Sequence, residues 1–268
     1  MNGAADAELA VAAAQAGAAV VRAMYGTALE RFGKSGGDFA TAADLEAERA
    51  IVEVIRARRP ADAVTGEEGG RSGPDGARRR WLVDPLCGTL NYAAGMMLAG
   101  VNVALRAGPG ITAAASADPF SGEVFWTDGR RARVRSGDAD TDLAPSADSR
   151  LVDVNLDPPF PNAPGFRAVR LLADEAFTAR FRPRVVSTTL AVAWVAAGRR
   201  AAYVTDGDLR GSVHFASGIA LCQAAGCVVT GIHGQPLHTG AGGLVAAADH
   251  ATHGDLLAMI RNQSPPGG

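Results

Sequence analysis

Lysine is almost absent from this chain of 268 residues, because Lys34 is the only lysine among 26 basic side chains. The basic residues are balanced by 28 acidic ones, and a net charge of −2 offers no polybasic surface for nucleic acid or membrane. No positively charged flank precedes an apolar core in Met1–Asp6, and no apolar run is expected to be long enough to span a bilayer. We therefore expect a cytoplasmic protein with neither nucleic acid nor membrane as a partner.

Cysteine is also scarce. The chain has three cysteines, Cys87, Cys222 and Cys227, which is an odd number at wide and irregular spacing. This pattern is typical of reduced thiols and excludes a disulfide framework as the main source of stability.

The remaining composition, 47% hydrophobic and 20% charged, is ordinary for a globular protein large enough for one domain or two intimate halves. Periodicity predicts two helices over residues 7–31 and 42–58, a glycine-rich loop over 66–76, and an antiparallel meander from 81 to 134. Polar residues follow, and helices and strands then alternate. We expect an α+β half over 1–137 that carries most site residues, and an α/β half over 138–268 that closes a cleft.

The second half has its own predicted elements. The pattern predicts one helix over 168–180, a strand over 184–187, and helices over 188–197 and 214–225. Strands are expected at 151–155, 201–204, 228–232 and 244–247, with a last helix over 250–260.

Oxygen-bearing side chains recur at the ends of these elements. Glu67, Asp84, the Leu86 carbonyl and the Thr89 hydroxyl would together supply four ligands to a hard divalent cation. The turn at Gly88-Thr89 has backbone N–H groups suited to a phosphate, and a metal beside an anion site is what phosphoryl transfer to water needs. Taken singly, the same residues also have plainer interpretations: Asp44 would cap a helix, Glu67-Glu68 would be a solvated pair, and Asp-Pro would be a turn.

Five ordered motifs together resemble the inositol monophosphatase family, in the Mg²⁺-dependent, lithium-sensitive phosphatase superfamily. They are Thr41-Ala42-Ala43-Asp44, Gly66-Glu67-Glu68, the core stretch Trp81–Tyr92, Val195–Arg199 together with Ala216–Gly226, and Leu244–Ala247. The resemblance implies a layered αβαβα sandwich, a homodimer, and hydrolysis of a small phosphomonoester such as a polyol, sugar or nucleotide phosphate.

The resemblance also implies roles for single residues. Glu67, Asp84, Leu86 and Thr89 would hold the first Mg²⁺, Asp44 and Thr89 would activate water, and the backbone of Cys87, Gly88 and Thr89 would hold phosphate. The loop that begins at Asp206 would contact the rest of the substrate, and it is about two residues longer than is usual in the family.

Two family positions differ in this chain, because Cys87 and His214 stand where the resemblance places aspartates that hold a second metal. We expect the Cys87 sulfur and a His214 nitrogen to lie close together, since both aspartates would reach one ion. Three outcomes stay open. The protein remains a phosphatase on a weakened metal set, or Asp84, Cys87 and His214 bind Zn²⁺. Otherwise the pocket serves another small-molecule reaction through Cys87 and His214, or binding alone, with no metal.

Overall fold

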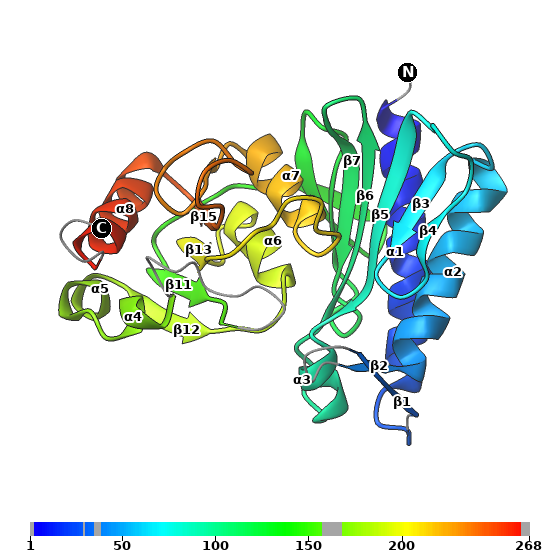
Figure 1. Ribbon diagram of the computed structural model, residues 1–268, viewed down its shortest axis with the longest axis horizontal. Helices are drawn as coiled ribbons and strands as arrows, with labels where there is room; N and C mark the ends of the chain where they lie inside the picture. Colours follow the sequence, from blue (N-terminus) through cyan, green and yellow to red (C-terminus); the bar gives the residue numbers. More distant parts are fainter. Residues whose placement is uncertain (1–2, 29, 35–38, 157–167, 264–268) are drawn as a thin grey trace.

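The computed structural model describes residues 3–28, 30–34, 39–156 and 168–263. Five layers follow one another along the long axis of the molecule, helices alternating with two sheets (Figure 1). Helices α1 (Gly3–Met24) and α2 (Ala42–Arg58) pack on each other and on the outer face of the larger sheet. The expected α/β fold, a layered αβαβα sandwich, is confirmed.

The larger sheet has eight strands in the order β10-β9-β8-β7-β6-β5-β3-β4. Their bounds are β3 Ala63–Gly66, β4 Gly70–Ser72, β5 Arg79–Cys87, β6 Gly100–Ala107, β7 Gly110–Ala117, β8 Val124–Thr127, β9 Ala132–Ser136 and β10 Ala139–Asp142. From β5 to β10 each strand is antiparallel to the next, which confirms the predicted meander, while β3 runs parallel to β5.

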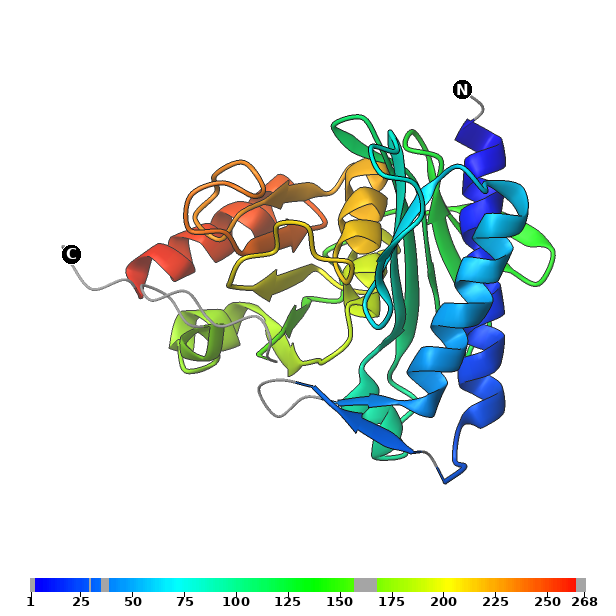
Figure 2. The same ribbon diagram turned by 45° about the vertical axis from the view of Figure 1, so that its right-hand side comes forward.

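The smaller sheet has five strands in the order β12-β11-β13-β15-β14. Their bounds are β11 Leu151–Val154, β12 Arg182–Val185, β13 Ala202–Thr205, β14 Val228–Thr230 and β15 Leu244–Ala247. The buried helices α6 (Leu190–Ala196) and α7 (Ala216–Ala225) lie between the two sheets, as the turned view in Figure 2 also shows. The remaining helices are α3 Thr89–Ala93, α4 Ala168–Leu172, α5 Glu175–Arg180 and α8 His250–Asn262.

Several predicted boundaries were wrong where the segments are short or polar. The first helix ends at Met24, and residues 31–33 form β1, which pairs with β2 (Phe39–Thr41). The helix predicted over 168–180 is two helices, because the Asp174 side chain accepts a hydrogen bond from Phe177 N and starts α5. The expected glycine-rich loop contains the edge strand β4, whose polar residues show no alternation.

Further bounds in the second half also differ. Strand β12 lies two residues earlier than predicted, α6 is shorter at both ends, and α7 begins two residues later, at Ala216. Strand β10 carries the larger sheet to Asp142, five residues beyond the expected division after residue 137. Its side chains are all exposed, which explains why the segment resembled a linker.

Helix α1 contradicts the expectation that no apolar run is long enough to span a bilayer. By length and composition it is apolar enough to cross a membrane, although no such run was predicted. Half of its most apolar window is buried inside the molecule, against α2 and strands β6 and β7. A Cβ on Gly17 would lie 2.6 Å from Ile51 Cδ1, so this helix packs closely through small residues. Its hydropathy is that of a core helix.

Candidate metal and phosphate site

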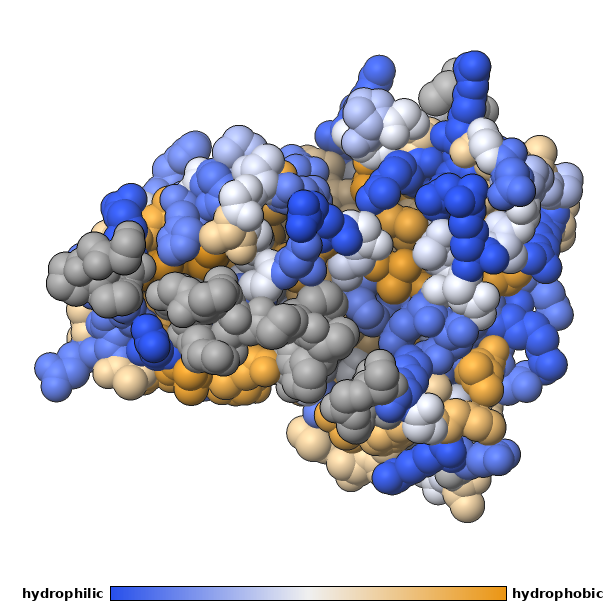
Figure 3. All heavy atoms as spheres, viewed as in Figure 1, coloured by the Kyte–Doolittle hydropathy of each residue, from blue (hydrophilic) through white to orange (hydrophobic). Residues whose placement is uncertain are grey.

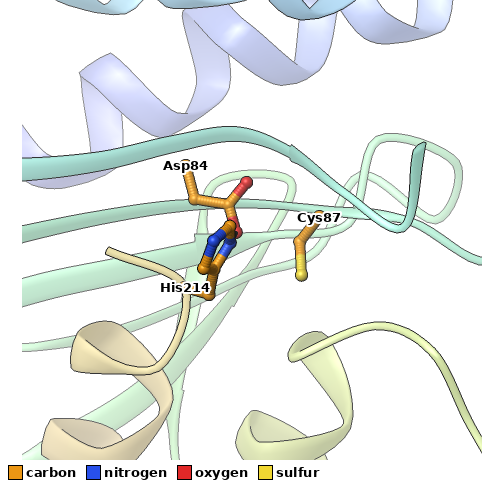
Figure 4. A group of neighbouring side chains, drawn as sticks. All are labelled: Asp84, Cys87 and His214. Atoms are coloured by element: carbon orange, nitrogen blue, oxygen red, sulfur yellow. Dashed lines mark hydrogen bonds and ion pairs between the residues drawn. The ribbon is translucent and has the colours of Figure 1, made fainter. Parts of the chain in front are cut away.

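The candidate site lies at the end of β5, where a break in strand register aligns two side chains. The pairing of β5 with β6 shifts between Asp84 and Cys87. In a regular strand residues three apart point to opposite faces, but the irregularity directs both toward His214, in the loop before α7 (Figure 4). One ligand atom from each of Asp84, Cys87 and His214 lies within 4.8 Å of the others. The expected proximity of Cys87 and His214 is therefore confirmed.

Asp84 is fully buried and serves as the centre of the site. Its Oδ2 lies 2.9 Å from His214 Nδ1 and accepts a hydrogen bond of 3.3 Å from Asn102 Nδ2. Burial alone would raise the pKa of Asp84, but the facing charge of His214 outweighs it and holds that pKa below the usual value. In turn, burial would lower the pKa of His214, and the Asp84 carboxylate raises it well above the ordinary value.

Glu67 lies beside Asp84 because β3 pairs in parallel with β5 and Glu67 N donates to Val83 O at 3.0 Å. Its Oε1 lies 2.8 Å from Lys34 Nζ, and its Oε2 lies 3.8 Å from His214 Nδ1. Burial, followed by repulsion from Asp84, raises the pKa of Glu67 to about 8. The buried Asp84 and the half-buried Glu67 repel each other, so together they form a site that a cation would stabilise.

Thr89 and Asp44 make direct contact across two elements. The Thr89 hydroxyl lies 3.0 Å from Asp44 Oδ1 and 3.0 Å from the Leu86 carbonyl. Asp44 also closes a capping box at the start of α2, accepting from Thr41 N at 2.7 Å and from Thr41 Oγ1 at 2.6 Å. Burial raises the pKa of Asp44 to about 6 despite these bonds. The helix-capping interpretation is confirmed, and the same carboxylate also orients Thr89.

Gly88 makes the turn that follows β5. Its φ of +104° is in the left-handed region, and a Cβ there would lie 2.8 Å from the Leu98 carbonyl oxygen and 3.1 Å from that of Ser187. Only glycine fits such a backbone without strain. The preceding Cys87 sulfur lies 2.9 Å from Thr189 Oγ1 and accepts from Thr189 N at 3.2 Å. Burial and the nearby Asp84 charge raise the pKa of the Cys87 thiol, which favours the neutral thiol in the metal-free chain.

One expected substrate residue lies away from solvent. Asp206 is fully buried at the end of β13, and its Oδ2 accepts a hydrogen bond of 3.2 Å from Ala168 N. Its role as a residue that contacts the substrate stays a prediction. From the sequence alone, the buried Asp206 could not be distinguished from an exposed carboxylate of the same loop.

Three residues of the site were missed. Lys34 Nζ lies 2.8 Å from Glu67 Oε1 and 2.6 Å from Glu68 Oε1, and so bridges the two carboxylates. In the sequence, Lys34 was notable only as the single lysine. Asn102 on β6 and Thr189 before α6 orient Asp84 and Cys87, and Asn102 Nδ2 donates to Thr189 Oγ1 at 2.9 Å. Their positions depend on strand register and on layer packing, which no local pattern reveals.

The donor set fits a hard divalent cation. Glu67, Asp84, the Leu86 carbonyl and the Thr89 hydroxyl are all oxygen donors, the kind that Mg²⁺ prefers. Among the described residues, Asp84 Oδ1 is buried without a hydrogen-bond partner, which is costly unless a ligand completes it.

Comparison with known proteins identifies relatives of this chain. Residues 5–264 match the inositol monophosphatase family. An inositol-1-monophosphatase of Caulobacter vibrioides is 29% identical over 88% of this chain and 92% of its own length. A probable inositol 1-monophosphatase, ImpA, of Mycobacterium tuberculosis is 31% identical over 87% of this chain and 86% of its own. The crystal structure of the extragenic suppressor protein suhB from Bartonella henselae has the same fold, with a TM-score of 0.82 at 24% identity over 95% of this chain and 98% of that one. The chain belongs to the inositol monophosphatase family.

Proposed function

We propose that this protein is a Mg²⁺-dependent phosphomonoesterase that acts on a small polyol, sugar or nucleotide phosphate. The observation that carries the proposal is the contact of Thr89 with both Asp44 and the Leu86 carbonyl, beside the carboxylates of the half-buried Glu67 and the buried Asp84. Family relatives named inositol-1-monophosphatase favour inositol phosphates as the first substrates to try.

The proposed roles follow from the donors. Mg²⁺ held by Glu67, Asp84, Leu86 O and Thr89 Oγ1 would polarise phosphoryl oxygens and lower the pKa of bound water. When the Thr89 hydroxyl donates to Asp44, its oxygen has one lone pair for the metal and one to accept a hydrogen bond from the attacking water and orient it. Asp44, with a pKa of about 6, accepts the proton of that water through Thr89. The new phosphorus–oxygen bond replaces the ester bond, and the alcohol leaves with a proton taken from solvent.

The test is phosphate release from a panel of inositol, sugar and nucleotide monophosphates in excess Mg²⁺ or Mn²⁺. We expect release that disappears with a chelator and in Glu67→Gln, while Glu53→Gln, a change on the outer helix α2, leaves it intact. No release from any substrate with either metal would overturn the proposal.

A second candidate is another small-molecule reaction in the same pocket, and the proximity of Cys87 and His214 favours it. A thiol beside an imidazole suits covalent or acid–base chemistry. Native activity that survives in both Cys87→Ala and His214→Ala would exclude it. If Cys87 and His214 replace two aspartates, the double change Cys87→Asp with His214→Asp should increase Mg²⁺-dependent phosphate release. A pseudoenzyme that only binds would show no turnover that responds to metals or thiol reagents.

The proposal also includes a homodimer in the cytoplasm. Exposed apolar side chains gather at α3 and the loop after it, where Leu90 is 54% exposed and Met97 is 64% exposed. Figure 3 shows apolar atoms over this end of the molecule. A surface of this kind favours contact with a second copy, and sedimentation velocity tests it.

A further inference from the structure

We infer that Asp84, Cys87 and His214 form a zinc site. This inference holds whether or not the protein hydrolyses phosphomonoesters. The three donors are a carboxylate oxygen, a sulfur and an imidazole nitrogen within 4.8 Å of one another. Zn²⁺ takes this mixture of ligands in tetrahedral sites, and three protein ligands leave the fourth position for water or another ligand.

A second Mg²⁺, which family membership implies beside the first, does not fit these donors. Mg²⁺ requires oxygen ligands and binds sulfur and imidazole poorly, whereas Zn²⁺ is borderline soft and binds both. The charges also balance. A thiolate, a carboxylate and a neutral imidazole sum to −2, so Zn²⁺ makes the buried site neutral and lowers the cost of its burial.

The surroundings of the three donors supply an independent observation. Asp84 Oδ1 is buried without a hydrogen-bond partner in the described part of the chain, while Oδ2 lies 2.9 Å from His214 Nδ1 and accepts from Asn102 Nδ2 at 3.3 Å. One carboxylate oxygen is therefore available to a metal while the other is held in place.

Cys87 is arranged as a thiolate ligand would be. The Thr189 backbone N–H donates to its sulfur at 3.2 Å, and the Thr189 hydroxyl lies 2.9 Å away. Donors of this kind stabilise a metal-bound thiolate and fix its direction. Zinc binding displaces two protons into solvent, one from the Cys87 thiol and one from the His214 imidazolium, so the raised pKa values of both groups are compatible with metal binding.

A buried network of hydrogen bonds holds Asn102 and Thr189, which contact Asp84 and Cys87, in place. Asn102 Nδ2 donates to Thr189 Oγ1 at 2.9 Å and Asn102 Oδ1 accepts from Ser116 Oγ at 2.7 Å. Ser116 Oγ lies 2.8 Å from Ser217 Oγ on α7, two residues beyond the loop that carries His214. The donors of the zinc site are thus held by one connected set of hydrogen bonds across β6, β7 and α7.

The test is metal binding by the purified full-length chain after removal of metals with a chelator. We expect the wild type to take up one equivalent of Zn²⁺, and Co²⁺ in its place to give a thiolate-to-metal charge-transfer band in the near ultraviolet. Cys87→Ser and His214→Asn should weaken zinc binding by about a hundredfold or more, since even partners outside the ligand set account for about 10–100-fold. Cys227→Ser and His250→Asn, which lie outside the cluster, should bind zinc as the wild type does.

Zinc uptake that is absent in the wild type, or unchanged in Cys87→Ser and His214→Asn, would overturn the inference. Should Cys87→Ser fail to fold, the Co²⁺ spectrum of the wild type decides, because a missing charge-transfer band excludes sulfur as a ligand. Glu67→Gln separates this inference from the proposed phosphatase, since it removes a carboxylate of the first metal site and leaves all three zinc donors.

Discussion

The carboxylates at and around Asp84 are paired with cationic side chains of the same protein. His214 lies against Asp84, and Lys34 bridges Glu67 and Glu68. These pairs place two cationic groups beside the carboxylates that a metal would use. A substitution of Lys34 or His214 should therefore change how strongly these cationic side chains compete with a metal ion for the carboxylates.

Thr89→Ala should reduce phosphate release by about 10²–10⁴-fold, the range typical of lost general acid–base assistance. The change removes the hydroxyl that lies 3.0 Å from Asp44 Oδ1. Steady-state kinetics with the best substrate of the panel measure it. Thr89→Ser keeps the hydroxyl and should retain most of the rate, and a Thr89→Ala rate within a few-fold of the wild type would contradict the proposed role.

Lys34→Gln should lower the Mg²⁺ concentration needed for half-maximal binding by about two- to fivefold, as expected for one partly exposed ion pair. The ammonium lies 2.8 Å from Glu67 and competes with the metal for it. The Mg²⁺-dependent rise in Tm gives the midpoint without any substrate. Lys34→Arg keeps the charge and serves as the control; an unchanged midpoint in Lys34→Gln would show that no competition exists.

At the scale of elements, the stretch Trp81–Tyr92 shows what the sequence can and cannot predict. Its apolar run predicted the buried strand β5, and Gly88 predicted the turn. The irregular pairing between Asp84 and Cys87 could not be predicted, because register depends on the partner strand β6. The pair of Lys34 with Glu67 depends likewise on the pairing of β1 with β2, because strands of three residues are too short to show a hydrophobic period.

Gly88→Ala should lower the free energy of unfolding by about 1–3 kcal/mol, because it combines a left-handed backbone with a clash against the Leu98 carbonyl oxygen at 2.8 Å. Urea unfolding measures the loss. Gly108→Ala is the matched control, with φ of +74° in the β6–β7 turn and no atom of the described residues within 4 Å of a new Cβ. Equal losses in the two variants would show that the close contact at Gly88 contributes nothing.

At the scale of the whole molecule, α6 and α7 join the two sheets and bring His214 and Thr189 to the end of β5. The alternation of helices and strands predicted the layers, but it could not predict which polar groups meet across them. Such contacts are set by the packing of segments about a hundred residues apart.

Ser116 and Ser217 offer a test of that packing. Both are fully buried, and their hydroxyls lie 2.8 Å apart between β7 and α7. Ser217→Ala and Ser116→Ala should each lower the free energy of unfolding by about 1–3 kcal/mol, and the double variant should lose less than their sum by about 1 kcal/mol. Urea unfolding of the four proteins gives the coupling. Ser116 combined with the exposed Ser121 should be additive; additivity in the first pair would contradict direct contact.

The stability of the metal-free protein should depend on pH through Glu67. Its pKa of about 8 in the folded chain is raised from an ordinary 4.5 by burial and Asp84, with Lys34 and His214 opposing the shift. The folded protein therefore binds this proton more tightly than the unfolded chain. The stabilisation is complete below pH 4.5 and is lost as the pH rises to about 8. Tm measured in chelator from pH 5 to 8 should fall more steeply in the wild type than in Glu67→Gln, and parallel curves would contradict the assignment.

Because Lys34 is the only lysine, it also determines where amine-directed reagents attach to the protein. Apart from the α-amino group, Lys34 is the one primary amine of the sequence, and it lies against the acidic side chains of the candidate metal site. An amine-directed dye, crosslinker or sensor surface therefore attaches either at the chain's start or within this site. Thiol coupling at the half-buried Cys227, or an added tag, would leave the site unmodified for binding studies.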